Sequence, residues 1–264
     1  HLMNLEIDKK NALITGGANG IGKSISEGLA NEGVNVFFTS RSQKTIDGME
    51  KTLKRYKIKS KGIKVDFSNE SSLKKFLKII KKLKIDILVN NAGHTLDITD
   101  PYCDISEWQK LMRVNFETPV QIVNAVVPYM KKKKWGRIVN ITSCAGLENS
   151  GPVTYTVSKA ALTAYTRTMG RILATEAKNV VMTAVFPGVV VTKGGHWEKI
   201  LKTNPEHAKK YLEERCPLGR FGEVDEISPV VIFYCSQLAS FSHGAIVPVD
   251  AGQSRHFMTH NYLT

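Results

Sequence analysis

The chain of 264 residues is 42% hydrophobic and 23% charged, which is ordinary for a globular protein, and no apolar run approaches the roughly 18 residues of a membrane-spanning helix. Its four cysteines are scattered and form neither a disulfide framework nor a metal-type pair. The formal net charge of +13 comes mostly from the stretch between Lys51 and Lys84, where 13 Lys or Arg residues face only Asp66 and Glu70, so we interpret it as solvated helix surface and predict no nucleic-acid partner.

Short apolar runs alternate with longer amphipathic stretches along the chain. The runs that we interpret as strands are 12–14, 34–38, 58–65, 85–89, 138–141, 180–186 and 246–249. Helical periodicity predicts helices over 20–30, 71–83, 106–130 and 153–177. The alternation predicts an α/β fold of the Rossmann type, a doubly wound parallel sheet of about seven strands with helices on both faces.

No Pro-, Gly- or Ser-rich linker divides the chain, so we predict a single domain over residues 4–264. Residues 1–3 resemble a cloning remnant and leave no room for a signal peptide. Together with the scattered cysteines, this predicts a cytoplasmic protein without a membrane segment. The stretch 193–215 is longer than a strand–helix connection requires, and we expect an inserted lid over a substrate site.

The first predicted strand ends in a glycine-rich turn, Thr15-Gly16-Gly17-Ala18-Asn19-Gly20-Ile21-Gly22, and a helix follows at once. Glycines let a backbone approach a pyrophosphate closely, and a helix N-terminus stabilises its charge. A purely structural turn is the alternative. The glycine spacing differs from the GxGxxG of the common dinucleotide fingerprint. It resembles the TGxxxGxG turn of the short-chain dehydrogenase/reductase family, and that resemblance implies a nicotinamide cofactor.

The end of the second predicted strand, Phe37-Phe38-Thr39-Ser40-Arg41-Ser42, indicates which nicotinamide cofactor binds. A carboxylate there would accept a hydrogen bond from the ribose 2′-OH of NAD(H), but the segment has none. Arg41 can instead hold a 2′-phosphate with two charge-assisted hydrogen bonds, and Ser40 adds a hydroxyl. The segment therefore favours NADP(H) over NAD(H). A surface arginine that opens the next helix is the alternative interpretation of Arg41.

The resemblance to the family continues in three later segments. Val65-Asp66-Phe67 is similar to the segment that meets the adenine ring, and Asn90-Asn91-Ala92-Gly93 to the family's NNAG after the fourth strand. Pro187-Gly188, followed by Thr192, resembles the segment that anchors the nicotinamide carboxamide. The resemblance thus implies a cofactor site made of Gly16, Asn19, Gly20, Ile21, Gly22, Ser40, Arg41, Asp66, Phe67, Asn91, Ala92, Gly93, Tyr155, Lys159, Pro187, Gly188, Val190 and Thr192.

Ser143, Tyr155 and Lys159 form the candidate catalytic group. Tyr155 and Lys159 are four residues apart and so share one face of a predicted helix. A free phenol titrates near 10, and we expect the ammonium and the positive nicotinamide of the oxidised cofactor to lower its pKa. The resemblance implies that Ser143 hydrogen-bonds the substrate oxygen and that Lys159 binds the nicotinamide ribose. It also implies that Asn115 holds a helix open for a proton-relay water.

The overall pattern resembles the 3-oxoacyl-carrier-protein reductase branch of the family. This implies an NADP(H)-dependent oxidoreductase that interconverts a carbonyl and a secondary alcohol, with Lys131–Lys134 and Arg171 near the active-site entrance as a docking patch for an acidic carrier. A sugar or a secondary metabolite is the alternative small-molecule substrate. A non-catalytic NADP(H)-binding protein and a nucleotide-sugar epimerase are the other classes, disfavoured by the intact catalytic residues and by the glycine spacing. No His or Cys spacing indicates a metal.

The predicted helices at 106–130 and 153–177 resemble the elements through which family members pair. Small residues on the second of these would let two helices approach closely: Ala160, Ala161, Ala164 and Gly170. The region around Val247 and Val249 resembles a second contact. Two self-complementary contacts predict a homotetramer, and the first contact alone predicts a homodimer.

Overall fold

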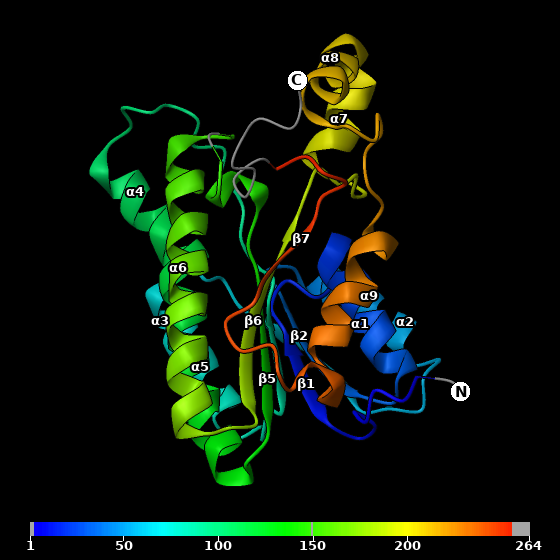
Figure 1. Cartoon of the computed structure of the whole chain (residues 1–264), viewed down its shortest axis with the longest axis vertical. Helices are drawn as coiled ribbons and strands as arrows, with labels where there is room; N and C mark the ends of the chain where they lie inside the picture. Colours follow the sequence, from blue (N-terminus) through cyan, green and yellow to red (C-terminus); the bar gives the residue numbers. More distant parts are fainter. Residues whose placement is uncertain (1–2, 149, 255–264) are drawn as a thin grey trace.

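The computed structural model of the chain describes residues 3–148 and 150–254, and within them a seven-stranded sheet runs through the middle of the molecule (Figure 1). The strand order is β3-β2-β1-β4-β5-β6-β7, and every neighbouring pair is parallel. The strands are β1 (Asn11–Ile14), β2 (Asn35–Ser40), β3 (Ser60–Lys64), β4 (Ile87–Asn90), β5 (Gly136–Ile141), β6 (Val180–Pro187) and β7 (Ile246–Val249). The predicted Rossmann-type sheet is confirmed, and the predicted strands differ from the observed ones only at their ends.

A layer of helices covers each face of the sheet (Figure 1). The helices on one face are α1 (Gly20–Asn31), α2 (Gln43–Leu53) and α9 (Val224–Tyr234). Those on the other face are α3 (Glu70–Ile80), α4 (Ile105–Met112), α5 (Thr118–Lys133) and α6 (Val153–Glu176). Two short 3-10 turns follow strands or helices, η2 (Cys144–Gly146) and η3 (Gln237–Ala239).

Each face of the sheet buries its own apolar cluster. Strand side chains alternate between faces, so Ala12 and Ile14 of β1 join the cluster under α1, α2 and α9, whereas Leu13 joins the one under α3, α5 and α6. The helices supply apolar residues at helical spacing, such as Ile25 and Leu29 of α1. Because both faces are covered, the central strands are apolar at nearly every position.

The predicted helix at 106–130 is interrupted by one π-helical turn, η1 (Arg113–Glu117). Within it the N–H of Thr118 donates to the carbonyl of Arg113, five residues earlier. Pro119 explains the interruption, because it has no N–H for the carbonyl of Asn115 and its ring crowds that carbonyl. The apolar pattern continues on both sides of this turn, so periodicity alone did not reveal the break.

The predicted insertion at 193–215 contains two helices, α7 (His196–Thr203) and α8 (Pro205–Arg215), which project beyond the carboxyl ends of the strands at the top of Figure 1. Ligands of open α/β sheets bind at these ends, so α7 and α8 lie where a lid is expected. Two predictions fall partly outside the described residues: the cloning remnant, at residues 1–2, and the end of the predicted domain, at 255–264.

Candidate active site

The turn between β1 and α1 has a shape that requires glycine. Gly16 has a φ of +63°, in the left-handed region that favours glycine. A Cβ atom on Gly22 would lie 2.3 Å from the carbonyl oxygen of Gly16 and 2.5 Å from Nδ2 of Asn91. The first turn of α1 therefore packs directly against the loop that precedes it, and any side chain at Gly22 would push the two apart.

The N-terminus of α1 presents unpaired backbone donors. Asn19 is the N-cap residue but makes no side-chain hydrogen bond to the helix, and the first turn contains no acidic residue. The first N–H groups of a helix have no partner within it, and the helix dipole adds positive potential there. The predicted residues Asn19, Gly20, Ile21 and Gly22 thus form a backbone site suited to a pyrophosphate.

Thr15 and Asn91 join the end of β4 to the glycine turn. The Thr15 hydroxyl accepts hydrogen bonds from the backbone N–H groups of Asn91 and Ala92, both at 2.9 Å. Nδ2 of Asn91 donates to the carbonyl of Thr15 at 3.0 Å. The structure therefore brings the predicted residues Asn91, Ala92 and Gly93 beside the turn. Thr15, which organises this contact, was quoted in the motif but not predicted as a site residue.

A cavity of about 480 Å³ opens beside the turn at the carboxyl ends of the strands. It is lined by half of the predicted cofactor residues: Gly16, Asn19, Ser40, Arg41, Asp66, Phe67, Asn91, Ala92 and Gly93. The lining residues that were not predicted for the cofactor are Ala18, Thr39, Val65, Ser68, His94, Leu96, Lys110 and Val114. This volume is typical of a site that encloses a small molecule.

Arg41 and Asp66 supply opposite charges to this cavity. Arg41 is exposed, and its guanidinium forms no ion pair with the residues that the structure describes. Oδ1 of Asp66 accepts hydrogen bonds from the hydroxyl and the backbone N–H of Ser68, at 2.7 and 2.9 Å. The hydroxyl bond chiefly, and the charge of Arg41 to a smaller extent, lower the pKa of Asp66. The cavity therefore offers a guanidinium free for a phosphate and an ionised carboxylate free for an amino group.

The segment after β6 runs from the sheet to the glycine turn. The backbone N–H of Val189 donates to Oε1 of Gln253 at 3.0 Å. Farther along, Thr192 is so close to Gly20 that a Cβ on this glycine would lie 3.2 Å from the threonine methyl group. The segment thus reaches the phosphate-binding turn from the side of β6. The predicted residues of this segment do not line the 480 Å³ cavity: Pro187, Gly188, Val190 and Thr192.

Tyr155 and Lys159 lie on the first two turns of α6. Nζ of Lys159 is 5.7 Å from the centroid of the Tyr155 ring and donates to the carbonyl of Ile141 at 2.9 Å. The side chain of Lys159 is 3% exposed, and burial lowers its pKa to about 8. Because an ammonium carries three donors, this lysine has donors left for a ligand after bonding the carbonyl.

The pKa of Tyr155 is shifted by its protein surroundings. Burial raises it, and a hydrogen bond from the Ser143 hydroxyl lowers it only in part. The expectation that Lys159 and the oxidised nicotinamide together lower this pKa concerns the site with cofactor bound and stays a prediction. A phenol keeps its proton at neutral pH, and a raised pKa makes it a weaker acid, so the protein groups alone do not bring the pKa of Tyr155 toward the operating pH.

Ser143 stands two residues beyond the end of β5 and caps η2. Its Oγ accepts a hydrogen bond from the backbone N–H of Ala145 at 3.2 Å, and its hydroxyl is near enough to Tyr155 to lower the pKa of that phenol. Burial raises the pKa of the adjacent Cys144 thiol to about 11, so Cys144 is not an activated nucleophile. The structure thus brings the Ser143 hydroxyl near Tyr155, as a shared site for a substrate oxygen requires.

Asn115 is fully buried in η1 and joins three elements. Its Nδ2 donates to the carbonyl of His94 and to Oγ of Ser158, both at 3.0 Å, while its Oδ1 accepts from the backbone N–H of His94 at 3.1 Å. The side chain therefore holds the loop after β4 against α6, close to Lys159. Because Pro119 has no N–H, the backbone carbonyl of Asn115 lacks its usual helical donor.

Trp197 holds α7 and α8 together above this site. Its ring centroid lies 4.4 Å from that of Tyr211 and 4.9 Å from that of Phe221. The Tyr211 hydroxyl accepts a hydrogen bond from Nε2 of Gln253 at 3.1 Å. Gln253 is buried and also supports the segment after β6, so it connects this segment to α8. It was missed because a single glutamine near a strand end has no sequence signature.

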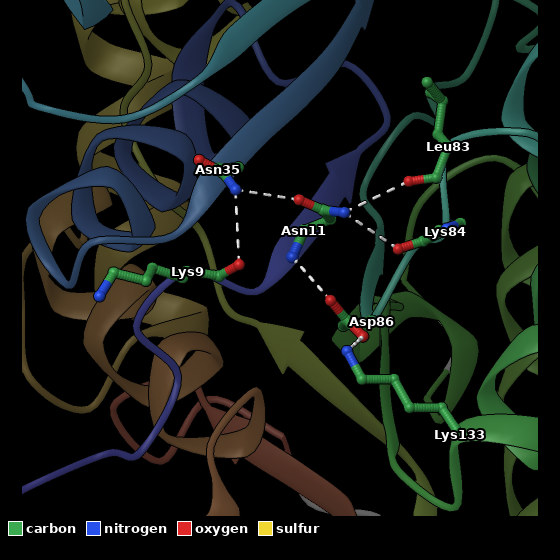
Figure 2. Close-up of polar contacts among 7 residues, drawn as sticks. All are labelled: Lys9, Asn11, Asn35, Leu83, Lys84, Asp86 and Lys133. Carbon is green, nitrogen blue, oxygen red and sulfur yellow. Dashed lines mark hydrogen bonds and ion pairs between the residues drawn. The ribbon is translucent and has the colours of Figure 1, made fainter.

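The residues predicted to dock a carrier lie at the amino ends of the strands, at the opposite end of the sheet from the cavity. Lys133 pairs with buried Asp86, directly before β4 (Figure 2). Lys131 pairs with Glu176, the last residue of α6. Helices that connect parallel strands return along the sheet, so the ends of α5 and α6 lie beside the amino ends of the strands. The expectation that these lysines and Arg171 flank the active-site entrance of their own chain is wrong.

Metal ligands and membrane helices were also sought in the described part of the chain. Among residues 3–148 and 150–254, no three His, Cys, Asp or Glu side chains are grouped so that they could hold a metal ion. None of the described helices is both long enough and apolar enough to cross a membrane. All four cysteines are free thiols: Cys103, Cys144, Cys216 and Cys235.

Known proteins share this fold and much of this sequence. The family model for short chain dehydrogenase matches residues 10–199. The chain is 35% identical over 254 residues to 3-oxoacyl-[acyl-carrier-protein] reductase FabG of Aquifex aeolicus, which covers 95% of this chain and 99% of that protein. It is 33% identical over 251 residues to FabG of Thermotoga maritima, with 94% and 99% covered.

Among solved structures, L-sorbose reductase from Gluconobacter frateurii, complexed with NADPH and L-sorbose, has a TM-score of 0.86 to this chain at 26% identity. The match covers 95% of this chain and 98% of that one. The family match spans most of the chain and includes the glycine turn, Ser143, Tyr155 and Lys159. The protein belongs to the short-chain dehydrogenase family.

Proposed function

We propose that this protein is an NADP(H)-dependent oxidoreductase that interconverts a ketone and a secondary alcohol. One observation carries the proposal. Ser143, Tyr155 and Lys159 lie at the carboxyl ends of the strands, as does the cavity that Arg41 lines. A relative of this chain is named as a reductase, and a similar structure contains NADPH. A non-catalytic binding protein would not require the Ser143 hydroxyl near Tyr155 beside a buried lysine.

The residues present fit NADP(H). The unpaired N–H groups of α1 would hold the pyrophosphate, and Arg41 with Ser40 would hold the 2′-phosphate. The ionised Asp66 would accept a hydrogen bond from the adenine amino group. Lys159, with donors left after its bond to the Ile141 carbonyl, would hold the nicotinamide ribose. When bound, the cofactor supplies or accepts the hydride.

Tyr155 is the proposed proton donor in reduction and the proton acceptor in oxidation. Ser143 would donate a hydrogen bond to the same substrate oxygen as negative charge develops on it. Lys159 would stabilise the phenolate that remains after proton transfer, because its ammonium lies close to the ring. The backbone carbonyl of Asn115, which lacks its usual helical donor, would hold a water that returns the proton toward Lys159.

Carbonyl-dependent oxidation of NADPH, followed by its absorbance, tests the proposal. A panel should contain simple ketones, ketoses and acetoacetyl thioesters, each with NADPH and with NADH. We expect turnover with at least one carbonyl and a preference for NADPH. A lack of carbonyl-dependent oxidation over the whole panel would refute the proposed function.

The relatives suggest two substrate classes, a 3-oxoacyl group on a carrier protein and a sugar. A carrier that docked on Lys132 and Arg171 would face the far edge of this chain's sheet, so it would have to serve the active site of a neighbouring copy. Reversing both charges should then raise KM for the carrier-linked substrate and leave a small ketone unaffected. Equal effects on both substrates would exclude docking at this patch.

We also propose a homo-oligomer, a tetramer or a dimer, in the cytoplasm. Val153, Val157 and Ile172 are exposed apolar residues on α6 and would be covered by pairing. Gly170, which was expected to contribute, is buried in its own chain instead: a Cβ there would lie 2.4 Å from the backbone nitrogen of Gly244. The free thiols support a reducing compartment.

A further inference from the structure

One carboxylate near Ser143 has an oxygen that the described residues leave without a partner. Oε1 of Glu148 is buried and forms no hydrogen bond with the described residues. The other buried side-chain atoms without partners belong to hydroxyl, amide and imidazole groups. Glu148 is half-buried as a residue, and leaving this one oxygen of its charged group without a donor costs more than for an uncharged group. Such an atom indicates a hydrogen-bond donor other than the described residues.

Glu148 lies in the loop between η2 and α6, five residues beyond Ser143. Its backbone N–H donates to the carbonyl of Cys144 at 3.1 Å. Its carboxylate is close enough to the Cys144 thiol to contribute, after burial, to the raised pKa of that thiol. The hydroxyls of Ser143 and Ser150 lower the pKa of the same thiol to a smaller extent. Glu148 therefore belongs to the group of side chains around the proposed site of the substrate oxygen, and it does not line the cofactor cavity.

Tyr211 of α8 adds a donor on the same side. Burial chiefly raises the pKa of Tyr211, to about 12, and Cys144 contributes to this shift, so the two groups lie within electrostatic range of each other. The hydroxyl oxygen accepts a hydrogen bond from Gln253, which leaves the O–H free to donate. An acceptor and a donor that the described residues leave unused, Glu148 and Tyr211, therefore both lie within electrostatic range of the thiol next to Ser143. A molecule with several hydroxyl groups can satisfy both, and an apolar chain can satisfy neither.

We infer that Glu148 accepts a hydrogen bond from a substrate hydroxyl, so that the substrate is a polyhydroxylated ketone or the corresponding polyol. The inference rests on the proposed function, because it names the substrate class of the same site. An acyl chain would cover the carboxylate without giving it a donor, and sites built to bond a hydroxyl reject analogues without one by about 10⁴-fold. An ammonium group could also pair with Glu148, but the buried ammonium of Lys159 in the same site opposes a second cation.

The test compares kcat/KM with NADPH for xylulose (both enantiomers), 2,3-pentanedione and the acetoacetyl thioester of N-acetylcysteamine. Glu148→Ala should lower kcat/KM for the better xylulose enantiomer about 10- to 100-fold, because a hydrogen bond to a charged group is lost. The hydroxyl-free diketone should be unaffected. Glu148→Gln keeps an acceptor oxygen and should fall between the wild type and Glu148→Ala. Glu206→Gln, at an exposed position of α8, is the matched control and should change none of these values.

A binding measurement separates substrate contact from general damage to the site. In a Tyr155→Phe background, calorimetric titration with the polyols xylitol and arabinitol in the presence of NADP⁺ should show binding that Glu148→Ala weakens by the same factor. The affinity for NADP⁺ itself should be unchanged, which also shows that the variant is folded.

Three results would overturn the inference. The first is a wild-type kcat/KM that is higher for the thioester than for xylulose. The second is a Glu148→Ala variant whose kcat/KM falls equally for xylulose and for the diketone. The third is a wild-type kcat/KM that is higher for aminoacetone than for hydroxyacetone. A failure of the proposed function has a different signature, because the wild type would then oxidise NADPH with none of these carbonyl compounds.

Discussion

Replacing Lys159 with methionine should stabilise the protein and abolish its activity. The lysine is 3% exposed, and its ammonium bonds the carbonyl of Ile141 without a carboxylate partner among the described residues. Burial lowers its pKa from 10.5 to about 8, so the folded state disfavours the charged form. Methionine has a similar length, adapts to irregular space and carries no charge. The buried lysine therefore destabilises the folded protein, and we expect it to be kept because catalysis requires it, as is common for catalytic groups.

The expected magnitude follows from this pKa. Its fall from 10.5 to about 8 corresponds to about 3 kcal/mol of unfavourable free energy for the protonated lysine in the folded state. Methionine leaves the Ile141 carbonyl without a donor, which costs about 1–2 kcal/mol. The net gain near neutral pH is then about 1–2 kcal/mol, or a rise of about 2–8 °C in melting temperature for a chain of this size.

The pH dependence isolates the contribution of burial. The folded-state pKa lies below the unfolded-state value, so the penalty is full below about pH 8, where both states carry the proton. It is relieved as the pH rises from about 8 to 10.5, because the folded state then loses its proton before the unfolded state does. The stability advantage of Lys159→Met should therefore shrink across this window.

Thermal unfolding followed by circular dichroism between about pH 7 and pH 10 measures this change. Lys132→Met, at an exposed lysine of α5, is the matched control and should show no comparable stabilisation. NADPH oxidation by the same preparations should be lost in Lys159→Met only. A melting temperature below that of the wild type near pH 7, or an advantage that does not vary with pH, would refute the reasoning. Retained activity would remove Lys159 from the proposed mechanism.

Four further outcomes are expected. Tyr155→Phe should lower turnover by about 10²–10⁴-fold with nearly unchanged NADPH affinity, as steady-state kinetics and cofactor titration would show; near-normal turnover would exclude Tyr155 as the proton donor. Arg41→Asp should reverse the preference for NADPH over NADH in a direct comparison of kcat/KM, and a wild type that already prefers NADH would contradict our interpretation of this residue. Gln253→Leu should raise the substrate KM and reduce stability by about 1–3 kcal/mol, because it leaves a buried N–H of the segment after β6 unpaired, whereas Tyr211→Phe loses only the contact with α8 and should cost less. Light scattering in moderate salt should show a tetramer or a dimer, and a monomer at micromolar concentration would count against pairing through α6.

Local patterns in the sequence determined the fold class and much of the candidate site. Apolar runs and helical periodicity depend on residues close together in the chain, so they predicted the parallel sheet and most of its helices. The glycine turn, Arg41 at the end of β2, and the four-residue spacing of Tyr155 and Lys159 are also local. A helix places such a pair on one face whatever the rest of the chain does. For the same reason, the position of Ser143 just beyond β5 could be predicted from the strand alone.

Only the tertiary structure decided which distant polar groups meet and how deeply they are buried. The contact of Asn115 with Ser158, the two hydrogen bonds of Gln253 and the pairing of Lys133 with Asp86 join residues far apart in the chain. A single polar side chain has no periodic signal, so nothing in the sequence announces its partner. Burial also set the directions of the pKa shifts, since Tyr155 and Lys159 are both governed by loss of water. The unpaired oxygen of Glu148 could not be predicted from the sequence either, because the burial of an atom depends on every element packed around it.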